Sequence, residues 1–257
     1  MNFKNVHSKV VKFIIVKNFY LKMKIFLKII KFLVSLFALY TALSIFTILF
    51  FRIIDPPVSA FINSKADPLL GLISFSDVKQ KSISVKNVSK YAALAVIASE
   101  DQRFFEHFGF DFEQIEKAMK ENEHRKRIRG ASTVSMQVAK NMFLWSGKNI
   151  IRKGFEAYYT LMLELLWSKE RIIEVYLNIA EMGNEIYGIE AASKIYYEKP
   201  SIKLNPTEAA TIIAVLPNPT KRDPRRPSGY LIHRRDNILQ QMNLIGGVNI
   251  LNEYISY

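Results

Sequence analysis

Two adjacent carboxylic acids, Glu100 and Asp101, follow a run of alanine, valine and isoleucine residues. A carboxylate placed where apolar walls meet solvent is suited to general-base catalysis, whereas two acids at a helix end are more often simply solvated. Many large aromatic side chains are unusual in an exposed loop, so the aromatic residues that follow favour a structured site over two solvated acids. These are Phe104, Phe105, Phe108, Phe110 and Phe112. The rings either belong to the core or dip into a membrane surface.

A second segment, residues 130–141, carries polar side chains at helical spacing. Thr133, Gln137 and Lys140 are four and three residues apart, so they share one face of a helix. A hydroxyl, an amide and an ammonium group near a helix N-terminus suit an anionic phosphate group. An ordinary solvated face has the same pattern. Ser132 is expected to cap this helix, which extends to about Leu144.

A third segment places Arg152 and Glu156 four residues apart, with Lys153 beside them. This spacing is typical of a surface ion pair that contributes a few tenths of a kcal/mol. Taken alone, the segment therefore indicates helix stabilisation rather than chemistry.

The elements that position these segments are predicted to be helices, since residues beyond 84 follow a helical apolar period and show no run of alternating strands. Ser168 is expected to cap one helix, and Asn205 with Glu208 has the form of a capping box. The expected helices cover about residues 85–99, 132–144, 151–167, 168–180, 208–216 and 233–244. The apolar stripe of the third is Ile151, Phe155, Tyr158, Met162 and Leu165.

Upstream, residues 32–51 form an uncharged stretch of the length that crosses a bilayer. Residues 1–31 contain eight lysines and no acid, which predicts a cytoplasmic N-terminus and an outside location for residues after about 52. A cleaved signal peptide is the main alternative, with a weak cleavage pattern at Val58-Ser59-Ala60. A buried core helix is the other alternative, but this stretch has no polar face.

Composition excludes several classes of protein. Most of the net charge of +13 comes from the lysines beside the apolar stretch, so it does not indicate a nucleic-acid partner. The absence of cysteine excludes disulfides and thiol chemistry, and the four histidines have no ligand spacing, so no metal site is expected.

Taken in order, these segments resemble the family 51 glycosyltransferases, which polymerise peptidoglycan. The pattern E-D-x-x-F-x-x-H-x-G-x-D is matched at Glu100, Asp101, Phe104, His107, Gly109 and Asp111. A second pattern is matched at Gly130, Ser132, Thr133, Gln137, Lys140 and Asn141, with departures at Ala131 and Met136. The pattern R-K-x-x-E is matched at Arg152, Lys153 and Glu156, and a fourth begins at Lys169. The resemblance covers about residues 85–242 and is nearest to monofunctional enzymes of Gram-negative bacteria.

The resemblance implies a mostly α, lysozyme-like helical catalytic domain preceded by a single N-terminal transmembrane helix. The expected organisation is a basic cytoplasmic segment (1–31), the transmembrane helix (32–51), a connector (52–84) and the peptidoglycan glycosyltransferase domain (85–257). The implied reaction polymerises lipid II into glycan strands by inverting transfer, forms β-1,4 linkages and releases undecaprenyl diphosphate. A membrane-tethered lysozyme-like hydrolase and a non-catalytic cell-wall scaffold are the alternatives.

The same resemblance implies a role for each matched residue. Glu100 corresponds to the catalytic base and Glu156 to a second essential glutamate that orients cations. The expected substrate and diphosphate-binding residues are Thr133, Gln137, Lys140, Arg152 and Lys153. The expected supporting residues are Asp101, Phe104, His107, Ser132 and Asn141.

The implied partners are lipid II, the growing glycan chain, the membrane and other cell-wall synthesis or division proteins, but no nucleic acid. No cofactor is required by the sequence, although the resemblance leaves room for a divalent cation, Mg or Mn, at the diphosphate. The implied location is the inner membrane, single-pass, with a periplasmic catalytic domain. Residues 112–129 are charge-dense and are expected to form a solvated loop or a mobile flap near lipid headgroups.

Overall fold

The computed structural model describes residues 3–56, 79–123, 130–145, 147, 149–255 and 257. The chain divides into two compact units, Met1–Phe50 and Phe51–Tyr257. The weak cleavage pattern at residues 58–60 and most of the expected connector lie outside the described residues.

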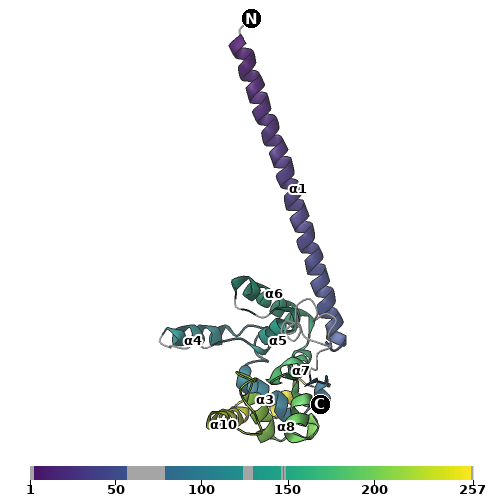
Figure 1. Cartoon of the computed structure of the whole chain (residues 1–257), viewed down its shortest axis with the longest axis vertical. Helices are drawn as coiled ribbons and strands as arrows, with labels where there is room; N and C mark the ends of the chain where they lie inside the picture. The colour runs from purple at the N-terminus through teal and green to yellow at the C-terminus, as the bar shows by residue number, and fades with distance from the viewer. Residues whose placement is uncertain (1–2, 57–78, 124–129, 146, 148, 256) are drawn as a thin grey trace. The chain divides into compact units, whose positions relative to one another are not determined.

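Helix α1, Phe3–Ile53, is one continuous helix (Figure 1). It begins well before the expected residue 32, because no glycine or proline interrupts the chain before Pro56. Its part Phe19–Ile53 is long and apolar enough to cross a membrane. Hydroxyl groups on this part bond within the helix, as Ser35 Oγ donates to Lys31 O at 2.9 Å and Thr47 Oγ1 to Leu43 O at 2.8 Å. These bonds leave the hydroxyl donors satisfied without water, as a lipid environment requires.

The second unit is built from packed helices. The buried helix α3, Lys90–Glu100, packs against α9, Pro206–Ala214, and α10, Gly229–Leu244. Helix α5, Val134–Phe143, packs against α6, Ile150–Leu166, and α7, Lys169–Ile179. The described part of this unit also contains α8, Ile189–Tyr197, α11, Asn249–Asn252, and 3-10 turns at Val85–Asn87 and Ser201–Lys203. The mostly helical fold class predicted from the sequence is confirmed.

Capping residues define where these helices begin. Ser168 caps α7 and Asn205 forms a full capping box with Glu208 at α9, as predicted. At α5, however, the cap is Thr133, whose hydroxyl accepts from Met136 N at 3.2 Å. The prediction for Ser132 was wrong by one residue, since either side chain has the chemistry of a cap.

A small sheet was not expected from the sequence. Strands β1, Lys79–Gln80, β3, Ile186–Tyr187, and β2, Glu181–Gly183, lie in the order β1-β3-β2. β1 is parallel and β2 antiparallel to β3. Strands of two or three residues are too short to show an alternating pattern, which explains why the sequence did not reveal them.

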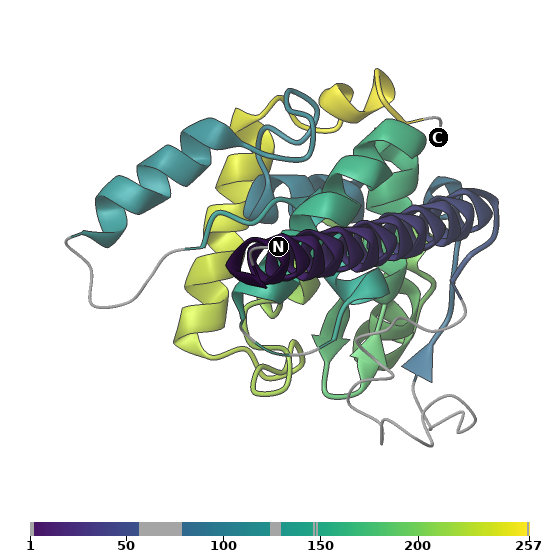
Figure 2. The same ribbon diagram turned by 90° about the horizontal axis from the view of Figure 1, so that it is seen from above.

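Helix α4, Phe112–Asn122, forms the first part of the segment 112–129, where a solvated loop or a mobile flap was expected, so this part is a helix rather than an irregular loop. Asp111 caps it by accepting from Gln114 N at 3.0 Å, so the acidic residue that ends the first motif also starts a helix. The helix lies at an edge of the unit, on the side away from the C-terminus (Figures 1 and 2). Residues 124–129 of the expected flap lie outside the described part of the chain.

Helix α6 buries a different face from the one its apolar stripe suggests. Ile151 and Leu165 are exposed, at 66% and 58%. The buried face instead consists of Glu156, Tyr159, Thr160, Leu163 and Glu164. Two buried carboxylates are tolerated there because each is paired with a cation, Glu156 with Arg152 and Glu164 with Lys169.

Candidate active site

Glu100 is the last residue of α3, and its carboxylate is held by side chains from two other places in the fold. Oε1 accepts from Ser99 Oγ at 3.0 Å and lies 3.3 Å from Arg234 Nη2 on α10. Oε2 accepts from Gln137 Nε2 on α5 at 3.0 Å. The side chain of Glu100 is 17% exposed, so the acid is fixed in position yet reachable.

The Gln137 amide is oriented from behind by Tyr176 on α7. The Tyr176 hydroxyl donates to Gln137 Oε1 at 3.1 Å, which directs the amide nitrogen toward Glu100. Burial, and next the negative charge of Glu100, raise the pKa of Tyr176 well above its ordinary value. The phenol therefore remains protonated and can act as this donor.

Asp101, the residue after Glu100, is turned inward and buried. Oδ1 lies 2.8 Å from His107 Nε2, and Oδ2 accepts from Val134 N at 3.0 Å. The acid thus joins the first motif to the start of α5. This geometry fits the supporting role that the sequence suggested for Asp101 and His107.

Thr133 is also used internally. Its hydroxyl donates to Gly109 O at 2.7 Å and accepts from Met136 N, and the residue is 3% exposed. Both functions of the hydroxyl are therefore occupied by the fold, although Thr133 borders a cavity. The structure favours a positioning role for Thr133 over the substrate contact expected from the sequence.

Phe104, in the loop that follows Glu100, is fully buried. The Lys169 ammonium lies 4.6 Å from the centre of its ring and donates to His107 O at 2.7 Å. Lys169 also pairs with Glu164 Oε1 at 2.8 Å, and Ser135 Oγ donates to the same oxygen at 2.5 Å. These contacts connect the loop after Glu100 to α5, α6 and α7.

The third motif forms a buried charge cluster on α6. Arg152 Nη1 lies 2.9 Å from Glu156 Oε2, and Lys153 pairs with the other oxygen of the same carboxylate. Glu156 is 3% exposed, and Arg152 Nε is buried with no hydrogen-bond partner among the described residues. The surface ion pair considered from the spacing is thus largely buried.

Lys140 lies within electrostatic reach of this cluster. Burial lowers the pKa of Lys140 below its ordinary value of 10.5, the charge of Glu156 opposes that shift, and Arg152 and Lys153 add to it. An incoming anion would oppose this shift by favouring the charged form, so Lys140 is suited to binding a negatively charged group.

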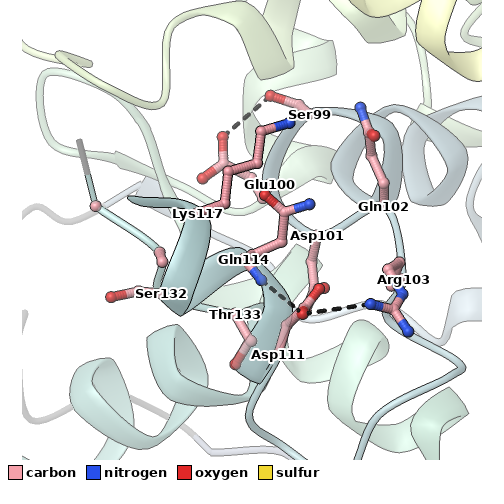
Figure 3. A pocket seen from close by; sticks show the side chains of 12 residues that line it. Ser99, Glu100, Asp101, Gln102, Arg103, Asp111, Gln114, Lys117, Ser132 and Thr133 are labelled. Atoms are coloured by element: carbon pink, nitrogen blue, oxygen red, sulfur yellow. Dashed lines mark hydrogen bonds and ion pairs between the residues drawn. The ribbon is translucent and has the colours of Figure 1, made fainter. Parts of the chain in front are cut away.

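Two cavities meet at Glu100. The larger, of about 520 Å³, is lined by Lys140 together with Gln137, Asn141, Tyr176 and Arg234, and we call it the Lys140 cavity. The smaller, of about 190 Å³, is bordered by α4 and by Lys117, and we call it the Lys117 cavity (Figure 3). Both cavities are lined by Ser99, Glu100, Gly130 and Ser132. Glu100 is therefore placed to act on groups that meet between two bound molecules.

The structure brings most of the predicted residues together. Glu100, Ser132, Gln137, Lys140 and Asn141 line the Lys140 cavity, whereas Arg152, Lys153 and Glu156 form the charge cluster near Lys140 without lining either cavity.

Arg234 and Tyr176 were not predicted from the sequence. Their signal was weak because Arg234 lies on a largely polar helix and Tyr176 lies between apolar residues of the expected helix 168–180.

A divalent cation held by the protein has little support from these residues. Among the described residues, no three His, Asp, Glu or Cys side chains come together at a metal-binding spacing. Glu156, the acid nearest the cations, already accepts from Arg152 and Lys153.

Comparison with known proteins identifies the family. The family model described as Transglycosylase matches residues 69–243, about two thirds of the chain. The chain belongs to the transglycosylase family. The resemblance seen in its motifs is thereby confirmed, and its helical catalytic unit has the lysozyme-like fold of transglycosylases.

Several curated relatives are similar over most of their length. A protein of Pasteurella multocida is 46% identical over 82% of this chain and 86% of the relative. A protein of Bacteroides thetaiotaomicron is 45% identical over 85% of this chain and 88% of the relative. A protein of Mannheimia succiniciproducens is 50% identical over 76% of this chain and 81% of the relative. Each of these transglycosylases is named a biosynthetic peptidoglycan transglycosylase.

Proposed function

We propose that this transglycosylase polymerises lipid II into the glycan strands of peptidoglycan during cell-wall biogenesis. The names of its relatives support the substrate class. The observation that carries the mechanism is the position of Glu100 at the junction of two cavities, each of which has cations on its wall. Two lipid-linked sugars can then meet at one carboxylate.

In the proposed reaction, the 4-hydroxyl of the acceptor's terminal N-acetylglucosamine attacks the anomeric carbon of the growing chain. A carbon–oxygen bond forms as the bond to the lipid diphosphate breaks, and the diphosphate leaves with the electron pair. The hydroxyl proton passes to Glu100. Inversion at the anomeric carbon requires the base and the leaving group to lie on opposite faces of the sugar, and a β-1,4 linkage results.

Glu100, rather than Glu156, is the proposed base. The Glu100 carboxylate borders both cavities and is held by neutral donors and one guanidinium, so it can take a proton. Glu156 is 3% exposed and both of its oxygens are paired with cations. Its proposed role is to fix Arg152 and Lys153.

The leaving diphosphate is assigned to the Lys140 side of the site. Lys140 lines the cavity there, and the charge cluster of Arg152, Lys153 and Glu156 lies within electrostatic reach of it. Cations aimed at the charge that develops on a leaving group stabilise the transition state more than the ground state. Ser132 and Asn141, on the wall of the same cavity, are the proposed neutral donors.

Gln137, Tyr176 and Arg234 are proposed to position Glu100. The first two form a hydrogen-bonded chain that ends on Oε2, and Arg234 contacts Oε1 from the opposite helix. A base held on both oxygens has fewer orientations to lose on reaching the transition state. This revises the direct substrate contact first expected of Gln137.

We propose that α1 anchors the protein in the inner membrane, with the N-terminus in the cytoplasm and the catalytic unit in the periplasm. The apolar part of α1 and the lysine-rich residues before it support this orientation. Exposed apolar side chains on α4 and α6, such as Phe112 at 74% and Ile150 at 88%, suit contact with lipid. Other cell-wall synthesis or division proteins are proposed partners.

The test is polymerisation of lipid II by the purified full-length protein, compared with Glu100→Gln. We expect the wild type to form glycan strands and release undecaprenyl diphosphate. The variant should lose activity by about 10²–10⁴-fold, since an amide cannot accept the proton. Unaltered polymerisation by the variant would exclude Glu100 as the base. Digestion of preformed glycan without polymerisation would instead show a hydrolase, and an inactive wild type would favour a scaffold.

A further inference from the structure

The Lys117 cavity contains two cations besides the acids that line it. Arg103 follows Glu100 on the first-motif loop, and Lys117 is on α4 (Figure 3). A cation whose charge is not already compensated by the fold binds a further anion more strongly than one held in ion pairs. The partners of each side chain therefore decide which one is available.

Arg103 is occupied. Its Nε lies 2.8 Å from Glu106 Oε2, its Nη1 lies 3.7 Å from Asp111 Oδ1, and it also pairs with Glu113. The pKa of Arg103 is raised, chiefly by the hydrogen bond to Glu106. Arg103 thus joins the first-motif loop to the first turn of α4.

Lys117 has no such partner among the residues that the structure describes. The acid one helical turn before it, Glu113, is paired with Arg103. The Lys117 side chain points into the cavity on the side of Ser99 and Glu100 (Figure 3). By contrast Lys120, three residues further along α4, pairs with Glu116 at 2.6 Å and does not line the cavity.

The other acids around the Lys117 cavity are also used by the fold. Asp101 binds His107 and Val134 N, and Asp111 caps α4. The cavity therefore offers one carboxylate for chemistry, Glu100, and one ammonium group without a fixed partner, Lys117.

We propose that Lys117 binds the diphosphate of the acceptor, the lipid-linked sugar whose hydroxyl attacks. This rests on the proposed function, in which both reacting molecules carry a lipid diphosphate. The Lys140 side binds the diphosphate that leaves, so the diphosphate that is retained needs a second cation on the opposite side of Glu100. Lys117 lines only one of the two cavities and Lys140 only the other, and Glu100 lies on the wall of both. Lys117 is thus a specificity residue for a charged acceptor.

The experiment compares two acceptors with the full-length protein. A labelled donor, lipid II in which the terminal 4-hydroxyl is replaced by hydrogen, can only donate. One acceptor is lipid II, and the other is the same disaccharide joined to the lipid through an uncharged ether. The rate of forming the labelled product is measured against acceptor concentration for the wild type, Lys117→Ala and Lys117→Arg.

Lys117→Ala should raise KM for the diphosphate acceptor on the order of tenfold or more, the effect of losing one charge-assisted hydrogen bond. It should change use of the ether acceptor less than about twofold, because that molecule lacks the group that Lys117 contacts. Lys117→Arg should restore most of the activity, and Lys120→Ala should behave as wild type. Thermal unfolding should be the same for all variants, since both lysines are exposed.

An equal loss with both acceptors, or no loss with either, would overturn the role of Lys117 while leaving the proposed function intact. A fall in kcat alone would also overturn it, because it would indicate an effect on Glu100 rather than on acceptor binding. A wild-type protein that joins neither acceptor would remove the proposed function and this role with it.

Discussion

At Glu100, three side chains from α3, α5 and α10 share one carboxylate. Ser99 and Gln137 are neutral donors, and Arg234 supplies a charge at 3.3 Å. Arg234 also lines the Lys140 cavity, so its guanidinium borders the space in which a ligand would bind. Arg234 therefore has the geometry both to position the base and to contact a bound sugar or phosphate.

Lys140 provides a test through pH. Because burial lowers its pKa below 10.5, Lys140 loses its proton at a lower pH than an ordinary lysine, and its charge is lost as pH rises. We expect kcat/KM of the wild type to fall on the alkaline side below pH 10.5. In Lys140→Arg this fall should move to higher pH, since a guanidinium stays charged.

The measurement is the pH profile of kcat/KM for both proteins on the same substrate, which reports ionisation in the free enzyme. Titration of the substrate is common to both profiles and cancels in their ratio. Identical alkaline limbs would show that Lys140 is not the cation that is titrated.

At the scale of elements, α6 supports the site through its polar face. Glu156 fixes two cations and Glu164 accepts from Ser135 and Lys169, so one helix supports both the charge cluster and the first-motif loop. Removing one partner of a buried pair costs about 3–5 kcal/mol, which explains why an acidic face can be stable only with these cations present.

Two glycines test how closely the first-motif loop packs on α6. Gly109 has φ of +78°, and a Cβ there would lie 2.8 Å from Thr160 Cγ2 and 3.0 Å from Glu164 Cγ. Gly109→Ala should lower the free energy of unfolding by about 1–3 kcal/mol and reduce activity, because the loop must shift. Gly154, within α6, has no heavy atom within 4 Å of the corresponding position.

Gly154→Ala is the matched control and should raise the free energy of unfolding by about 0.5–1 kcal/mol, since alanine favours the helix. Thermal unfolding followed by circular dichroism checks both variants. Shifts of the same sign in the two proteins would argue against close packing at Gly109.

At the scale of the whole molecule, the long apolar helix determines whether the enzyme reaches a substrate dissolved in a bilayer. An uncleaved anchor restricts the catalytic unit to the membrane surface, where lipid II is concentrated. A cleaved signal peptide would release it. Length and composition alone do not separate these cases, but chemical analysis does.

We expect the protein extracted from membranes to retain its N-terminal residues, as measured by intact mass and N-terminal sequencing. The length of the apolar segment favours this outcome, since signal peptides have an apolar region of about 7–15 residues. A mature chain that begins after Ala60 would contradict the anchor.

The sequence by itself determined the family, most of the helices and the residues of the motifs, but not α4, α8, Arg234 or Tyr176. Helix periods and caps depend on local spacing, which is why α7 and the capping box of α9 were predicted closely. The motifs likewise place the base and the cations in order along the chain. These features need no knowledge of distant contacts.

Only the tertiary structure decided which face of each helix is buried and which side chains from distant parts of the chain come into contact. The apolar stripe of α6 is exposed at Ile151 and Leu165, while the acids on its buried face are paired with cations. The Thr133 hydroxyl is occupied because Gly109 O lies 2.7 Å away. The contact of Arg234 with Glu100 joins residues 134 positions apart. Such pairings depend on how helices pack, and the energy of a buried charge depends on its partner in space rather than its neighbours in sequence.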